Sequence, residues 1–120
     1  MAEITRALQI YFDALHDGDV AKVRAVFLPG AHLYSASDGP LLDIPLEKYV
    51  EIVAGRPSPR SRGETRRDRI VSVDMSGPQT ALAKVECAIG PKLFTDYLTL
   101  LKVDGSWRII AKAYHYVPIG

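Results

Sequence analysis

The chain has 120 residues, of which 48% are hydrophobic and 24% charged, and its formal net charge at pH 7 is +1. This length supports one hydrophobic core, so we expect a single domain over 1–120. A charge this close to zero gives no general attraction to nucleic acid or to an anionic membrane. No apolar run approaches the roughly 20 residues of a membrane-spanning helix. Charged residues among the first twenty argue against a signal peptide, and Cys87 is the only cysteine. We expect a cytoplasmic protein.

The first half of the chain predicts three amphipathic helices. Apolar residues recur every three or four positions from Ile4 to Leu15, which is the spacing of a helix that packs one face on a core. Gly18 can end this helix, and Asp19 can cap the next one. The second helix is expected to end before Pro29-Gly30, a short strand to follow over 31–35, and the third helix to run from Pro45 to Gly55.

The second half predicts a meander of four strands. From Thr65 onward the apolar pattern alternates, as in strands that are half buried. Turn residues separate the strands at Gly77-Pro78, Gly90-Pro91 and Asp104-Gly105. Three helices followed by such a meander indicate an α+β fold, with the helices packed on one side of an antiparallel sheet.

Two segments carry a family resemblance. The opening YFDALHDGDVAKVRAVF and the closing LLKVDGSWRIIAKAY resemble the nuclear transport factor 2-like superfamily, also called cystatin-like, which includes ketosteroid isomerase and the polyketide cyclases. Within it, FTDYLTLLKVDGSWRII is most similar to a bacterial group named putative lumazine-binding. The resemblance spans roughly Ile4 to Val117. It implies a cone-shaped, curved antiparallel sheet wrapped around three N-terminal helices, with a pocket inside and a homodimer outside.

The two faces of the last two strands are assigned from this resemblance. Mapping onto the isomerase places one set of side chains inside the cone: Tyr97, Thr99, Lys112, Tyr114 and Tyr116. The opposite set is then expected to form the homodimer interface through the outer face of the sheet: Leu98, Leu100, Ile109, Ala111 and Ala113.

The isomerase chemistry itself is not expected. The resemblance places Tyr11 at the isomerase's oxyanion-binding tyrosine, Ser35 at its carboxylate base and Thr99 at its protonated acid. Serine and threonine cannot replace those carboxyl groups. We therefore expect no steroid isomerisation.

The polar side chains expected in the cavity or at its rim are the ligand-binding candidates: Tyr11, His32, Tyr34, Ser35, Tyr97, Thr99, Lys112, Tyr114 and Tyr116. Lys112 is either an amine whose pKa burial lowers, a partner for an anionic ligand, or a rim residue with its ammonium in water. His32 could pair with Asp38 as an acid and base. No metal-ligand spacing, phosphate-binding loop or dinucleotide motif is present, so we expect neither a metal nor a cofactor.

Six arginines lie between residues 56 and 69, against Glu64 and Asp68. Without an aromatic residue among them this loop offers no stacking platform for bases, so a solvated loop is favoured over a nucleic-acid site. The expected function is small-molecule binding in a mostly apolar pocket, the partner being an unidentified organic molecule. Two alternatives stay open, a metal-independent lyase, isomerase or hydrolase and a dimeric protein-interaction module.

Overall fold

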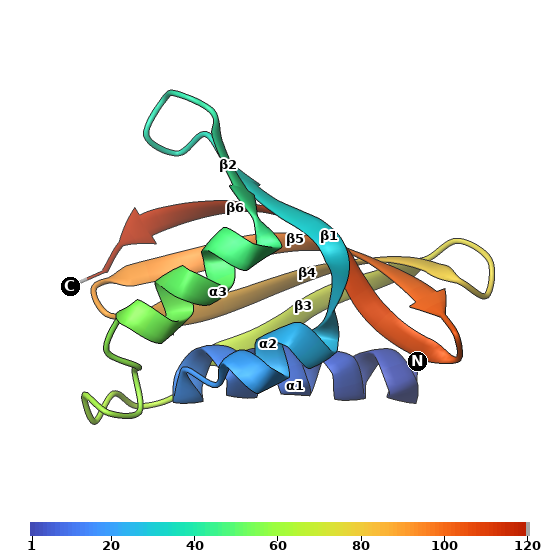
Figure 1. Ribbon diagram of the computed structural model, residues 1–120, viewed down its shortest axis with the longest axis horizontal. Helices are drawn as coiled ribbons and strands as arrows, with labels where there is room; N and C mark the ends of the chain where they lie inside the picture. Colours follow the sequence, from blue (N-terminus) through green and yellow to red (C-terminus); the bar gives the residue numbers. More distant parts are fainter. Residues whose placement is uncertain (120) are drawn as a thin grey trace.

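The computed structural model describes residues 1–119 and places three helices on one side of a six-stranded sheet (Figure 1). The elements are α1 (Ala2–Asp17), α2 (Val20–Val26), β1 (Phe27–Ser35), β2 (Leu42–Pro45), α3 (Leu46–Gly55), β3 (Asp68–Met75), β4 (Thr80–Ile89), β5 (Lys92–Val103) and β6 (Ser106–Pro118). The strand order is β2-β1-β6-β5-β4-β3. The α+β prediction is confirmed. Among the described residues no helix is both long and apolar enough to cross a membrane.

The sequence signals at the helix ends act as expected. Gly18 ends α1 in the left-handed conformation, with φ 66°, and its N–H donates to the carbonyl of Ala14. The Asp19 side chain then accepts a hydrogen bond of 3.2 Å from the backbone N–H of Lys22 and so caps α2. These two residues turn the chain sharply enough for α1 and α2 to pack together beneath the sheet (Figure 1).

Two features of the sheet differ from the prediction. The chain adds a short strand, β2, and β1 begins at Phe27, where the second helix was still expected. β1 also pairs with β6 in parallel, whereas the other strand pairs are antiparallel. The sheet is therefore mixed, because β1 pairs with β2 on one side and runs parallel to the last strand, β6, on the other.

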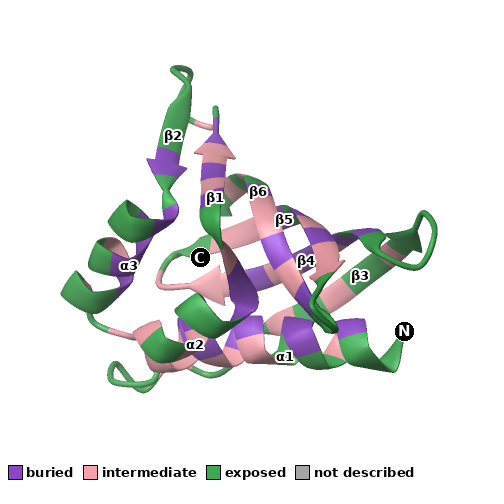
Figure 2. Ribbon diagram, turned by 45° about the vertical axis from the view of Figure 1, so that its right-hand side comes forward, coloured by how far each residue is buried: buried purple, intermediate pink, exposed green. Residues whose placement is uncertain are grey.

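The core fills the space between the helices and the concave face of the sheet. In Figure 2 the buried residues lie on the sheet-facing sides of α1 and α3 and recur along the central strands. The largest fully buried side chains include Tyr11, Phe27, Leu98, Leu100 and Ile109. The alternation of buried and exposed residues along β4 and β5 shows that only one face of these strands meets the core.

A bulge in β6 corrects the predicted assignment of faces. Thr99 pairs with Ala111 and Leu100 with Ile109, so Ile110 is an extra residue without a partner on β5. Such a residue moves the following side chains to the opposite face. Ile109 and Lys112 therefore both point inward, although the odd and even positions were expected to face opposite sides.

The face of β5 was also wrongly assigned. Leu98 and Leu100 were expected on the outer face, but both are fully buried against the helices. Tyr97 and Thr99 were expected inside the cone, but they occupy the alternate positions, and the Tyr97 side chain is 47% exposed with Lys84 lying over its ring. Apolar side chains gain more from the closed interior than the two polar ones, which decides the orientation of this strand.

Candidate functional site

A cavity of about 290 Å³ lies between α3 and the end of the sheet where β5 begins and β6 ends. The residues that line it come from most elements of the fold: Leu15, Asp38, Leu42, Ile44, Tyr49, Ile52, Arg56, Cys87, Ile89, Lys92, Phe94, Lys112, Tyr114 and Tyr116. We call its buried end, formed by Tyr49, Cys87 and Lys112, the floor. Its exposed end, with Asp38, Arg56, Lys92 and Tyr116, is the mouth.

The floor carries a buried ammonium group. Lys112 is only 5% exposed, and its Nζ lies 5.2 Å, 5.3 Å and 5.2 Å from the ring centroids of Tyr11, Tyr49 and Tyr114. The faces of aromatic rings attract a cation at such distances. Three rings therefore surround the charge and hold it next to the cavity.

A carboxylate lies behind this ammonium. Asp96 is fully buried, and its Oδ2 lies 3.7 Å from Lys112 Nζ, which is an ion pair but too long for a hydrogen bond. The Tyr11 hydroxyl donates to the same oxygen at 2.6 Å. Within residues 1–119 the other oxygen, Oδ1, has no hydrogen-bond partner. Lys112, Asp96 and Tyr11 thus form one buried polar group, which we call the floor triad.

The electrostatics of the triad keep the Lys112 amine and the Tyr11 hydroxyl protonated at neutral pH. Burial by itself lowers the pKa of Lys112, but the attraction of Asp96 and the neighbouring aromatic groups outweighs it, and the pKa is raised. Burial, followed by the proximity of Asp96, also raises the pKa of Tyr11 well above its usual value. The expectation of an amine with a lowered pKa is therefore wrong, and so is that of a rim lysine in water.

The mouth is richer in positive than in negative charge. Tyr116 donates a hydrogen bond of 2.6 Å to Asp38 Oδ1, and Lys92 Nζ lies 4.3 Å from the centroid of the Tyr116 ring. Arg56 completes the charged groups here, and within residues 1–119 it makes no ion pair. Among residues 1–119 Asp38 is the only acidic residue in the cavity lining, so Arg56 and Lys92 leave an excess of one positive charge at the mouth.

The predicted site residues divide into two groups. Lys112, Tyr114 and Tyr116 line the cavity, and Tyr11 lies directly behind it in the triad. The other five do not line it: His32, Tyr34, Ser35, Tyr97 and Thr99.

The β1 candidates make contacts of their own. His32 Nδ1 lies 2.6 Å from Asp43 Oδ1, and its ring stacks on Tyr34, so the expected pair with Asp38 is wrong. Ser35 is buried and its Oγ contacts Ser37 at 3.2 Å. These residues hold β1, β2 and their connecting loop together, away from the floor triad.

The site residues that the sequence did not predict include Tyr49, Cys87 and Asp96 around the floor, and Lys92 and Phe94 nearer the mouth. Asp96 carried a usable signal, because it alternates with Leu98 and Leu100 and so belongs to an apolar face. The residue beside Tyr11 is Asp96 and not Thr99. Burial raises the pKa of the Cys87 thiol to about 12, so this side chain packs as a small apolar group and is not a reactive thiolate.

The arginine-rich loop is largely neutralised by acidic neighbours. Ion pairs join Arg60 to Asp17, Arg62 to Glu64, Arg66 to Asp13 and Asp68, and Arg69 to Glu86. These pairs favour the solvated loop over a nucleic-acid surface.

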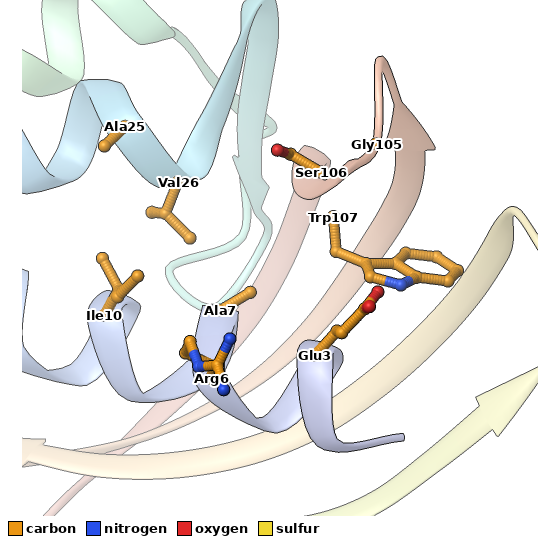
Figure 3. A pocket seen from close by; sticks show the side chains of 9 residues that line it. All are labelled: Glu3, Arg6, Ala7, Ile10, Ala25, Val26, Gly105, Ser106 and Trp107. Carbon is orange, nitrogen blue, oxygen red and sulfur yellow. The ribbon is translucent and has the colours of Figure 1, made fainter.

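A second hollow lies at the opposite end of the molecule, near the β5–β6 turn. Figure 3 shows Trp107 as one wall, with Glu3 of α1 beside its ring and Arg6 further along the same helix. Glu3 forms an ion pair with Lys102. This hollow has no buried charged group comparable to Lys112, and in residues 1–119 no cluster of three or more His, Cys, Asp or Glu could hold a metal ion.

Comparison with known proteins identifies relatives over nearly the whole chain. A family model described as putative lumazine-binding matches residues 1–115. A protein named aldolase FrzH from Cladobotryum sp. is 26% identical over 110 residues, which cover 90% of this chain and 84% of that protein. The crystal structure of an NTF2-like protein of unknown function from Silicibacter pomeroyi is 27% identical, covers 97% of this chain and 94% of its own, and has a TM-score of 0.85. A second such protein, from Shewanella baltica, is 26% identical, with 98% and 93% covered and a TM-score of 0.84.

Proposed function

This chain belongs to the family described as putative lumazine-binding, within the NTF2-like superfamily, and on that premise we propose that it binds a small organic molecule in the cavity above Lys112. The ligand is mostly apolar and flat and carries an oxygen acceptor at its inner end. Lumazine, a polar but flat heterocycle with ring carbonyl oxygens, shares the shape and the oxygen acceptor of this description.

The observation that carries the proposal is the unsatisfied hydrogen-bonding capacity of Lys112. Its ammonium has three N–H donors, and within residues 1–119 none of them makes a hydrogen bond, since Asp96 Oδ2 is 3.7 Å away. Nζ is not among the fully buried atoms of residues 1–119 that lack a partner, and Lys112 lines the cavity, so its donors are open to water or to a ligand. An oxygen of a ligand would accept from Nζ in place of that water.

The remaining walls suit a flat apolar body. The rings of Tyr49, Phe94, Tyr114 and Tyr116 line the cavity together with aliphatic side chains of α3, β2 and β4. Aromatic faces pack against planar molecules and add specific stacking geometry to the burial of apolar area.

A second candidate function is an enzyme of carbon–carbon bond chemistry. It is favoured by the relative named an aldolase, together with the Lys112 ammonium, which could stabilise negative charge on a substrate oxygen. No metal is needed for this role.

For the outer face of the sheet we propose a homodimer contact. After the correction of β5 and β6, this face includes the exposed side chains of Leu82 and Tyr97. Size-exclusion chromatography with light scattering tests it, and a clean monomer at high concentration would contradict it. A dimer that carries no ligand would favour the alternative of a dimeric protein-interaction module.

Native mass spectrometry of protein purified without added ligand, compared with its denatured mass, tests the binding function. The wild type and a matched control, Lys84→Met, whose lysine lies on the outer face, should both carry a non-covalent mass that Lys112→Met has lost. The same mass bound to all three proteins would show that Lys112 does not contact the ligand.

A further inference from the structure

We propose that the ligand is a carbonyl compound with an acidic group at its far end, the carbonyl oxygen accepting from Lys112 at the floor and the acidic group pairing with Arg56 at the mouth. The inference rests on the proposed function, because it assigns the ligand class of the same cavity. It follows from how charge is distributed along that cavity.

The floor is electrically balanced before any ligand binds. The positive charge of Lys112 faces the carboxylate of Asp96 at 3.7 Å, and both groups are buried. A carboxylate ligand at the floor would leave two negative charges against one positive charge beside two buried side chains, which is costly. A neutral carbonyl oxygen can accept a hydrogen bond from Nζ without changing this balance, so the floor favours a carbonyl over an acid.

The mouth has the opposite preference. Arg56 and Arg67 have no ion-pair partner within residues 1–119, whereas the other four arginines of this region have at least one, and of the two only Arg56 lines this cavity. Asp38, the acidic residue of the mouth, already accepts from Tyr116. A guanidinium in this position can bind a carboxylate through two parallel hydrogen bonds. An acidic group here stays partly in water, which keeps its desolvation cost low.

The same arrangement makes Lys112 a hydrogen-bond donor and not an amine nucleophile. Attack on a carbonyl carbon requires the neutral amine. Asp96, 3.7 Å away, raises the pKa of Lys112 and so keeps its side chain an ammonium. The ammonium polarises the carbonyl and stabilises negative charge that develops on its oxygen. The Tyr11 hydroxyl is occupied by Asp96 and acts on the ligand only by positioning that carboxylate.

Three benzene derivatives of nearly equal size separate these contributions: 4-acetylbenzoate, 4-isopropylbenzoate, which lacks the carbonyl, and 4-methylacetophenone, which lacks the carboxylate. Calorimetry should show that wild-type protein binds 4-acetylbenzoate about tenfold or more tightly than either of the others, because each loses a charge-assisted hydrogen bond. Lys112→Met should lose the preference for acetyl over isopropyl. Arg56→Gln should lose the preference for the carboxylate.

Matched controls test whether removing one positive charge outside the cavity has the same effect. Arg60→Gln and Lys84→Met remove a positive charge outside the cavity and should retain both preferences. If Lys112→Met does not fold, Asp96→Asn with Lys112→Met removes both members of the ion pair and leaves no unpaired buried charge. Isotope-edited infrared spectra on the wild type need no variant, and the bound acetyl C=O stretch should move to lower frequency than in water.

The outcomes distinguish this inference from the proposed function. Equal affinity for the acetyl and isopropyl probes, or an unshifted C=O stretch, would overturn the inference and leave ligand binding standing. A covalent adduct on Lys112 after borohydride treatment with 4-acetylbenzoate would overturn the donor role. If no probe binds at millimolar concentration and native mass spectrometry also finds no ligand, both proposals fail together.

Discussion

Removing the Lys112 ammonium tests the floor triad most directly. In Lys112→Met the Asp96 carboxylate stays fully buried and keeps only the 2.6 Å hydrogen bond from Tyr11, because Oδ1 has no partner in residues 1–119. Breaking a buried ion pair by removing one partner costs about 3–5 kcal/mol. Methionine fills most of the lysine's volume, so packing adds little to that cost. We expect the free energy of unfolding at pH 7 to fall by roughly 4 kcal/mol, a large part of the stability of a small domain.

The double variant shows whether charge is the cause. Adding Asp96→Asn to Lys112→Met removes the unpaired charge, so it should recover more than half of the lost stability. Urea unfolding of the wild type, both single variants and the double variant forms a complete cycle, and the coupling between the two sites should reach about 1–3 kcal/mol. A loss below 1 kcal/mol for Lys112→Met, or strictly additive changes, would refute the triad as an electrostatic unit.

Three further predictions concern other parts of the fold. The pKa of Cys87 is raised from 9.0 in the unfolded chain to about 12 in the folded protein, so the unfolded thiol loses its proton first and the free energy of unfolding falls as pH rises from about 9 toward 12. This one group contributes a slope of up to about 1.4 kcal/mol per pH unit. Cys87→Ala should remove that contribution, which urea unfolding between about pH 9 and 10 would measure. Leu98→Ala should cost about 2–5 kcal/mol and Thr99→Ala less than about 1, because only Leu98 faces the core; equal losses in thermal unfolding would contradict the corrected strand faces. Asp19→Ala should cost about 1 kcal/mol through the lost cap on α2, and Asp19→Asn, which can still accept from Lys22, serves as its control.

Local chemistry explains which parts of the fold were predictable. Gly18, Asp19 and the turn residues act within a few positions of themselves, so their effect is visible in the sequence. The parallel pairing of β1 with β6 joins segments about 80 residues apart, and no local pattern records it.

The site depends on features that alternation alone cannot show. Ile110 is an ordinary strand residue in the sequence, yet its bulge decides that Lys112 points inward. Asp96 stands in an apolar alternation, but mapping the neighbouring positions onto an isomerase drew attention to Thr99 instead. Its meeting with Tyr11, 85 positions away, exists only after the sheet has curved around α1.

The bulge at Ile110 divides β6 into a part that packs in the core and a part that lines the cavity. Before it, Trp107 and Ile109 belong to the hydrophobic core. After it, Lys112, Tyr114 and Tyr116 line the cavity. Odd-numbered residues face inward before the bulge and even-numbered residues face inward after it. Deleting the extra residue would therefore turn Lys112, Tyr114 and Tyr116 outward and leave Trp107 and Ile109 facing inward. A single insertion or deletion at this point would therefore exchange the whole chemical lining contributed by β6 and keep Trp107 and Ile109 in the core, but it would also leave Asp96 buried without Lys112, so a change of ligand by this route requires a second change at Asp96.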